Sequence, residues 1–288
     1  MIISVASGKG GTGKTLVATS LVLSMKPGER VQFLDCDVEE PNAHIFLKPV
    51  IIDREAVNVL IPEVDKQKCN YCGKCAEVCA YHAVAIFGKQ VLVFPNLCHS
   101  CGACSYLCLE NAITEKDREV GVIESGHSNG IEFVQGKLTI GEAMSPPVIR
   151  KVKEKIIDES TVIIDAPPGT SCPVMETVKG SDFCLLVIEP TPFGLNDLEL
   201  TVDTVNKLDI PCGVVINRSV GEDKKVLEYC NVEDIPILLT IPFDKDIAQQ
   251  YSRGITLADG MPRWQASFSG LIQSIRKIVN ERDSLIKR

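Results

Sequence analysis

Eight cysteines occur in two runs of four that share one internal spacing. The runs are Cys69, Cys72, Cys75 and Cys79, and then Cys98, Cys101, Cys104 and Cys108. One constant shift in residue number carries the first run onto the second, so the two runs form an internal repeat. Thiolates at these intervals suit cuboidal 4Fe-4S clusters, because tight turns bring three sulfurs to one cluster while the fourth sulfur reaches the other. The pattern therefore predicts two clusters that exchange ligands between the runs.

The repeat assigns a ligand set to each predicted cluster. The first set is Cys69, Cys72, Cys75 and Cys108, and the second is Cys98, Cys101, Cys104 and Cys79. Zinc sites and a disulfide framework are the alternatives. A zinc site needs four ligands and gains nothing from a third cysteine at the same spacing. Disulfides suit a short secreted chain, whereas this one has 288 residues and no signal peptide before its first expected strand.

The cysteine-rich segment, about 63–116, resembles the bacterial-type ferredoxin family. The resemblance rests on the doubled cysteine motif quoted above. The chain departs from the family pattern at Ala80 and Leu109, which stand where a proline usually follows the fourth cysteine. That departure loosens the expected turn without touching the ligands.

A glycine-rich loop near the N-terminus predicts phosphate binding. Its residues are Gly8, Lys9, Gly10, Gly11, Thr12, Gly13, Lys14 and Thr15. The loop lies between an apolar strand-like run, 2–6, and a helix-like run, 16–25, which is the context that a P-loop needs. Glycines let the backbone amides wrap a phosphate, and the following helix adds its positive N-terminus. Lys14 is expected to pair with the β- and γ-phosphates of ATP, and Thr15 to ligate magnesium.

A second lysine, Lys9, directly follows the first glycine of the loop. The loop thereby resembles the deviant Walker A signature of the MinD/Mrp/nitrogenase-iron-protein ATPases. The resemblance implies a homodimer in the ATP state, in which Lys9 crosses the interface to the partner's nucleotide and neutralises charge that develops on hydrolysis. Without the resemblance, Lys9 would be read as a solvated surface residue. The resemblance covers nearly the whole chain, including the segment 189–194.

Two apolar runs that end in acids continue the same resemblance. The first run ends in Asp35 and Asp37, and the second ends in Asp165 and leads to Gly169. The resemblance implies that Asp35 holds the magnesium shell and that Asp37 positions or activates the attacking water. Asp165 would lie near magnesium, usually through water, and Gly169 could swing its amide toward the γ-phosphate. Acids two residues apart at a strand end also suit a solvated turn.

Two later segments resemble the adenine-binding elements of these ATPases. Asn217 and Arg218 end one apolar run, and Pro242 lies in the segment 241–244. The resemblance implies that Asn217 reads the base and that Pro242 packs near it. Both residue combinations are common in other sequences, so these assignments rest on the resemblance.

Apolar runs alternate with helix-like stretches along the rest of the chain. The runs occupy 2–6, 31–34, 162–164, 183–188, 213–216 and 235–241. This alternation predicts an α/β fold with a mainly parallel sheet covered by helices on both faces. The segment 63–116 is expected to be an inserted α+β domain that divides the ATPase domain into 1–62 and 117–288. Strands are expected within 117–150, followed by a helix over 148–157.

Composition limits the classes of partner. The formal charge is −8 and aromatic residues make up 5%, which argues against a nucleic-acid surface. No apolar run approaches the roughly 18 residues that span a bilayer. Residues 265–288 have apolar side chains on one helical face, a pattern that favours packing on the sheet over membrane contact. Iron-sulfur ligation and five further cysteines indicate a reducing, cytoplasmic location.

These features lead to one principal hypothesis and two alternatives. The principal hypothesis is a homodimeric ATPase that couples ATP binding and hydrolysis to electron transfer through two 4Fe-4S clusters, with a redox protein as partner. The first alternative is an ATPase that assembles or carries iron-sulfur clusters or metallocofactors. The second is a positioning ATPase whose clusters sense redox state. Complete four-cysteine sets within one chain favour the principal hypothesis, because a delivery site is labile and often shared between subunits.

Overall fold

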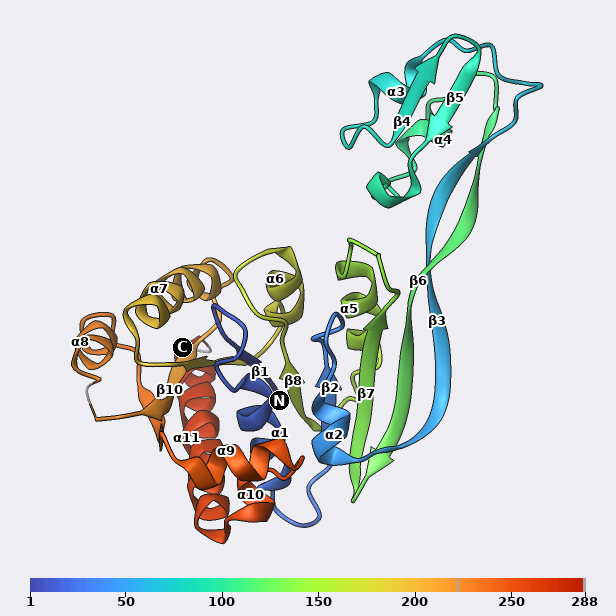
Figure 1. Cartoon of the computed structure of the whole chain (residues 1–288). Helices are drawn as coiled ribbons and strands as arrows, with labels where there is room; N and C mark the ends of the chain where they lie inside the picture. The colour runs from blue at the N-terminus through green and yellow to red at the C-terminus, as the bar shows by residue number, and fades with distance from the viewer. Residues whose placement is uncertain (222, 287–288) are drawn as a thin grey trace.

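The computed structural model describes residues 1–221 and 223–286, and these form a nine-stranded sheet in the order β11-β10-β9-β1-β8-β2-β7-β6-β3 (Figure 1). In chain order its strands are β1 (Ile2–Ala6), β2 (Val31–Asp35), β3 (Val50–Val64), β6 (Ile113–Ser128), β7 (Ile131–Leu138), β8 (Thr161–Asp165), β9 (Phe183–Ile188), β10 (Cys212–Ser219) and β11 (Ile237–Pro242). The strands from β11 to β7 are parallel, whereas β6 runs antiparallel to β7 and β3. The predicted mainly parallel sheet is confirmed.

Helices cover both faces of the sheet, as predicted. One face carries α1 (Lys14–Leu23), α2 (Ala43–Leu47), α9 (Lys245–Ser252), α10 (Leu257–Gly260) and α11 (Pro262–Ile286). The other face carries α5 (Pro146–Lys153), α6 (Cys172–Val178), α7 (Pro192–Lys207) and α8 (Lys224–Val232). Strand β9 is buried along its whole length, as expected of a central parallel strand enclosed by helices on both sides.

Strands β3 and β6 form a long antiparallel arm. The strands expected within 117–150 are confirmed by β7 and most of β6, whereas the sequence analysis did not anticipate β3. Their pairing runs from Val50 opposite His127 to Val64 opposite Ile113. The arm carries residues 65–112, which we call the cysteine module, away from the body of the molecule (Figure 1). The first half of β3 is mostly exposed and contains Asp53, Arg54 and Glu55. A search for apolar runs therefore passes over this strand.

The sequence repeat in the cysteine module is also a repeat of backbone conformation. Helices α3 (Lys74–Glu77) and α4 (Ala103–Tyr106) are related by the same shift in residue number as the two cysteine runs, and their first and last residues correspond. Backbone φ is positive at three pairs of positions related by the same shift, namely Tyr71 and Ser100, Gly73 and Gly102, and His82 and Asn111. Strands β4 (Val84–Phe87) and β5 (Gln90–Val93) form a hairpin, which is followed by the 3-10 turn η1 (Pro95–Leu97). The two runs therefore fold in the same way.

The helix predicted over 148–157 is corrected by the structure. Helix α5 begins at Pro146, because a proline in the first turn lacks only an N–H group that would have no helical partner. It ends at Lys153 because the side chain of Gln32 forms hydrogen bonds with the backbone that follows the helix. The Gln32 amide donates to the Lys155 carbonyl at 2.8 Å and accepts from the Ile157 N–H at 2.9 Å.

The strand predicted over 235–241 begins later than expected, at Ile237, as β11.

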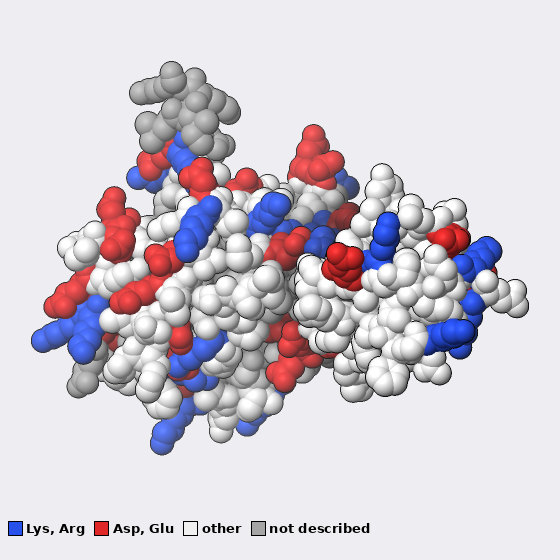
Figure 2. All heavy atoms as spheres, turned by 90° about the horizontal axis from the view of Figure 1, so that it is seen from above, with Lys and Arg blue, Asp and Glu red and all other residues white. Residues whose placement is uncertain are grey.

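The C-terminal helix packs on the sheet. Phe268, Leu271 and Ile275 of α11 are buried in the core, and Arg276 forms an ion pair with Glu29 at 2.5 Å. Residues 287–288, the end of the amphipathic pattern, lie outside the described residues. In the part of the chain that is described, no helix is both long and apolar enough to cross a membrane. Figure 2 shows acidic and basic side chains interspersed over the face seen from above.

Candidate functional site

Two glycines determine the path of the phosphate-binding loop between β1 and α1. A Cβ atom at Gly8 would lie 2.5 Å from the Cβ of Asp197 on α7. A Cβ atom at Gly13 would lie 2.3 Å from Nδ2 of Asn217 on β10. Gly13 also has a φ of 94°, in the left-handed region, immediately before α1 begins. Side chains at either position would therefore push the loop away from the elements that hold it.

A cleft of about 810 Å³ opens beside this loop. The predicted residues that line it are Gly10, Gly11, Gly13, Lys14, Thr15, Asp37, Asn217, Arg218 and Pro242. The predicted residues Gly8, Lys9, Thr12, Asp35, Asp165 and Gly169 do not line it. The cleft has the volume of a small-molecule or cofactor site. The structure thus arranges the phosphate-binding loop and the predicted adenine-binding segments around one space.

Phe243 and Asp244 also line the cleft, and both belong to the segment 241–244 that resembles an adenine-binding element. The sequence analysis missed the lining residues Ile247, Ala248 and Tyr251, which come from α9. Phe243 is 63% exposed, and Tyr251 stacks on Phe46 with ring centroids 4.8 Å apart. Nothing in the pattern of α9 distinguishes a residue that faces a cleft from one that packs on the sheet.

Two buried acids lie beneath the cleft. Asp35 and Asp165 end the adjacent strands β2 and β8 and are both fully buried. Thr15 Oγ1 donates to Asp165 Oδ2 at 2.5 Å, while Asp165 Oδ1 has no hydrogen-bond partner among the described residues. Asp35 accepts from the N–H groups of Asp37 and Ala43, both at 3.1 Å. One buried carboxylate oxygen therefore remains available to a cation or to water.

The acids of the site have raised pKa values because burial disfavours their charged forms. Burial raises the pKa of Asp37 to about 6, against the opposing attraction of Lys14. Burial and the nearby Asp165 raise the pKa of Asp35 well above its usual value, and burial raises that of Asp165. Lys14 Nζ lies 3.8 Å from Asp37 Oδ2. The carboxyl oxygens of these acids are ligands of the kind that suits a magnesium ion, which would be held mainly through water and phosphate.

Asn217 and Gly169 are both engaged with the phosphate-binding loop itself. Asn217 Nδ2 donates to the Thr12 carbonyl at 2.7 Å, and its Oδ1 accepts from the Arg218 N–H at 3.0 Å. The Gly169 N–H donates to the Ser7 carbonyl at 2.9 Å. In this conformation Asn217 therefore fixes the loop to β10, and the Gly169 amide points to the loop backbone.

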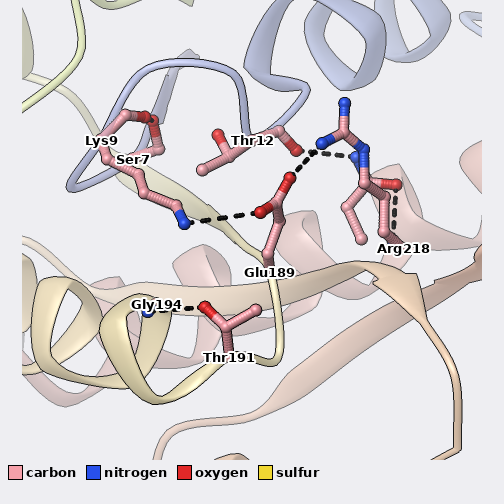
Figure 3. A network of polar contacts seen from close by, with 8 residues as sticks. Ser7, Lys9, Thr12, Glu189, Thr191, Gly194 and Arg218 are labelled. Carbon is pink, nitrogen blue, oxygen red and sulfur yellow. Dashed lines mark hydrogen bonds and ion pairs between the residues drawn. The ribbon is translucent and has the colours of Figure 1, made fainter.

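Lys9 lies beside Glu189, outside the cleft (Figure 3). Its Nζ is 3.4 Å from Glu189 Oε2, and Glu189 Oε1 accepts from Arg218 Nη1. Glu189 immediately follows β9 and its side chain is 15% exposed, compared with 34% for Lys9. One carboxylate thus joins the predicted dimer lysine to a residue that lines the cleft.

The eight predicted ligand cysteines gather in two separate pockets of the cysteine module. One pocket is lined by Cys69, Cys72, Cys75 and Cys108, and the other by Cys79, Cys98, Cys101 and Cys104. These are the two sets expected from the repeat, with the last cysteine of each run in the other run's pocket. Among the described residues, no three His, Cys, Asp or Glu side chains are grouped closely enough for a single metal ion. A cuboidal cluster is larger than one ion and holds its thiolates farther apart.

In each run, one backbone amide donates a hydrogen bond to the sulfur atom of the last cysteine. The Ala83 N–H donates to Cys79 Sγ at 3.2 Å, and the Ala112 N–H donates to Cys108 Sγ at 3.3 Å. The second bond is the first one repeated at the equivalent positions of the second run. Hydrogen bonds to the sulfurs are among the features that tune iron-sulfur centres, so the donor set and its surroundings fit such a group.

Comparison with known proteins identifies the nucleotide fold. A profile described as the CobQ/CobB/MinD/ParA nucleotide binding domain matches residues 3–257. The chain belongs to this family. The uncharacterized protein MJ0578 of Methanocaldococcus jannaschii is 33% identical over 283 residues, which cover 97% of this chain and 98% of that relative. The uncharacterized ATP-binding protein MJ0169 of the same organism is 26% identical over 86% of this chain and 76% of its own length.

A solved structure shares the fold. The septum site-determining protein MinD from Pyrococcus horikoshii, complexed with Mg-ADP, superimposes with a TM-score of 0.58 at 19% identity, with 96% of each chain covered. Together with the family match, this shows that the chain contains a nucleotide-binding domain with the MinD/ParA-like fold.

Proposed function

We propose that this chain is a homodimeric ATPase that couples ATP binding and hydrolysis to electron transfer through two 4Fe-4S clusters. In this proposal residues 63–116 form an inserted two-cluster ferredoxin domain within an ATPase domain made of 1–62 and 117–288. The observation that carries the proposal is the pair of four-cysteine pockets, which have related backbones and exchange their last ligand. When bound, the clusters would supply one-electron storage.

The residues of the cleft suit phosphoryl transfer. Lys14 lines the cleft and its side chain is 6% exposed, so its charge is available to a phosphate that binds in the cleft. Asp37 lines the same cleft, and a carboxylate there can orient the attacking water. Thr15, Asp35 and Asp165 would hold magnesium, the acids through water. Gly169 and Lys9 would approach the phosphates only after a change of conformation, because both are now engaged elsewhere.

An apolar connection between the cleft and the cysteine module supports coupling. Cys36 and Val38, on either side of Asp37, belong to one buried cluster that also contains Ala83 and Cys98 of the module. Val38 is tied to the sheet because its carbonyl accepts from the Leu138 N–H at 2.8 Å. A shift of the Asp37 segment would therefore displace side chains of this buried apolar cluster, which extends to the second cysteine set.

A cluster or metallocofactor carrier is the second candidate. One observation favours it, since Cys72 and Cys101 are exposed, one in each pocket. An exposed ligand can be reached by a protein that accepts the cluster. The two candidates differ in their partners, which would be a redox protein in the first case and a metallocofactor protein in the second.

The metal content tests the proposal. Protein reconstituted under anaerobic conditions should contain about eight irons and eight sulfides per chain, and the reduced form should show two interacting clusters by electron paramagnetic resonance. Stoichiometric zinc without iron would end the electron-transfer proposal. Transfer of the clusters to an apo-acceptor faster than electrons pass to a redox dye would instead favour the carrier.

A further inference from the structure

Glu189 is a carboxylate shared by two cations at the edge of the nucleotide cleft (Figure 3). Lys9 and Arg218 approach it from different segments, the phosphate-binding loop and the end of β10. Glu189 belongs neither to the cleft lining nor to the buried acids beneath the cleft. It immediately follows β9 and forms an ion pair with Lys9.

We propose that Glu189 is a positioning residue that holds Lys9 within its own subunit and delays its use by a second copy of this chain. The inference rests on the nucleotide-driven homodimer of the proposed function. In that dimer Lys9 must reach the partner's nucleotide, whereas here its ammonium group is 3.4 Å from its own subunit's Glu189. The contact must open before the dimer is competent.

The surrounding contacts fix the backbone of Lys9 but leave its side chain able to move. Ser7 Oγ donates to the Lys9 carbonyl at 2.7 Å, which holds the backbone of the loop. On the other side, the Thr191 N–H donates to the Glu189 carbonyl at 2.8 Å, and Thr191 Oγ1 caps α7 by accepting from the Gly194 N–H at 3.0 Å. Glu189 is therefore anchored, and the flexible lysine stem is the part that can swing.

Arg218 lowers the cost of opening this contact. If Lys9 leaves, the carboxylate of Glu189 remains paired with Arg218 and is not left uncompensated. A triphosphate carries more negative charge than one carboxylate, so the nucleotide of a second copy can attract Lys9 away from Glu189. The contact thus opposes dimerisation modestly and yields once a nucleotide is present on the other subunit.

Dimerisation tests the inference. With a non-hydrolysable ATP analogue, Glu189→Gln protein should dimerise in sedimentation velocity at about tenfold lower concentration than the wild type, because two such contacts open per dimer. Glu29→Gln is the matched control, since Glu29 pairs with Arg276 and is 23% exposed on the side chain. That control should dimerise as the wild type does. Unchanged or weaker dimerisation of Glu189→Gln would overturn the proposal.

A double-mutant cycle separates positioning from a structural role. In a Lys9→Ala background, Glu189→Gln should change the dimerisation midpoint by less than about twofold, since the group it positions is gone. An equal effect in both backgrounds would contradict the proposal.

Acylation of Lys9 without nucleotide, followed by mass spectrometry, detects the contact in the monomer. It should proceed about threefold faster in Glu189→Gln than in wild type, as expected when an exposed ion pair is lost. Equal rates would reject the contact itself. If wild type and variant both stay monomeric with the analogue, the proposed dimer fails and the delaying role of Glu189 fails with it, while a faster acylation would still establish the ion pair.

Discussion

The sheet and the cysteine module are held together by different means. Strand β9 of the sheet is buried throughout, and large side chains such as Phe33 and Phe183 are fully enclosed. In the module, neither α3 nor α4 has a buried residue, and Phe87 and Tyr106 are 79% and 89% exposed. Its buried apolar residues are Ala83, Val84, Cys98 and Ala112.

This difference indicates where each region obtains its stability. A region with a large apolar core is stabilised by burial, whereas a small domain without one usually needs disulfides, metals or a partner. The eight cysteines form no disulfides and line two pockets, so under the proposed function metal ligation would stabilise this module. We expect the ATPase fold to be independent of the clusters, and the module to depend on them.

Removal of iron is expected to have the largest effect. Chelation of the reconstituted protein should abolish the protection of amides in 65–112 against hydrogen exchange, because the module then has little buried apolar surface. Amides of β1 and β9 should keep their protection in the same sample. If the amides of the module stay protected after iron is lost, the module does not depend on the clusters for its stability.

Cavity-forming substitutions sharpen the comparison between the two regions. Phe183→Ala should lower the free energy of unfolding of the ATPase fold by about 3–5 kcal/mol, because Phe183 is fully buried. Phe87→Ala should change the free energy of unfolding of the cysteine module by less than about 0.5 kcal/mol, since that ring is mostly exposed. Denaturant titrations of both variants provide the measurement, and similar losses would contradict the account.

The two lysines of the loop should differ in what they contribute. Lys14→Ala should weaken ATP binding about tenfold or more, because Lys14 lines the cleft, while Lys9→Ala should leave binding within about twofold. Lys9→Ala should instead lower the hydrolysis rate by about 10²–10³-fold. Equilibrium binding and steady-state hydrolysis check both values. Full hydrolysis by a Lys9→Ala protein that stays monomeric would remove Lys9 from the mechanism.

Replacement of one ligand gives a smaller and local effect. Cys75→Ala should remove about half of the iron and change ATP affinity by less than about twofold, because Cys75 belongs to one pocket and is absent from the cleft lining. Cys172→Ala is the control, since that exposed cysteine lies on α6 outside the module. Iron analysis with calorimetric titration of ATP measures both effects. An equal loss of iron in the control would contradict the ligand assignment.

The sequence predicted those features that depend on spacing or on continuous apolar runs. The constant shift between the two cysteine runs grouped the cysteines into the two sets that share a pocket. The family resemblance placed both Asp35 and Asp165 near magnesium, and the two acids end paired strands. Strand β3 of the arm was missed because Asp53, Arg54 and Glu55 interrupt its apolar pattern, and the strand is exposed over half its length. Hydrogen bonding in three dimensions determined the rest, as when Gln32 ends α5 from a distant part of the sequence.

Contacts within the chain also differ from what the sequence suggested for the site. The sequence suggested that Asn217 reads the base, but both of its polar groups bond to Thr12 and Arg218 in this conformation. Nothing in the sequence around Glu189 indicated that it would meet Lys9, because the two are far apart along the chain and the order of strands in the sheet brings them together.

Coupling between nucleotide and redox state is the central claim, and linkage gives it a direct test. The midpoint potentials of the clusters should differ between protein with ADP and protein with a non-hydrolysable ATP analogue, and reduction should change the affinity for the analogue by the same free energy. A shift of about 59 mV in a one-electron potential corresponds to about a tenfold change in affinity. Lys14→Ala protein should show no shift at the same nucleotide concentration. Potentials that are identical with ADP, with the analogue and without nucleotide, together with an affinity that reduction leaves unchanged, would contradict the account and favour the carrier.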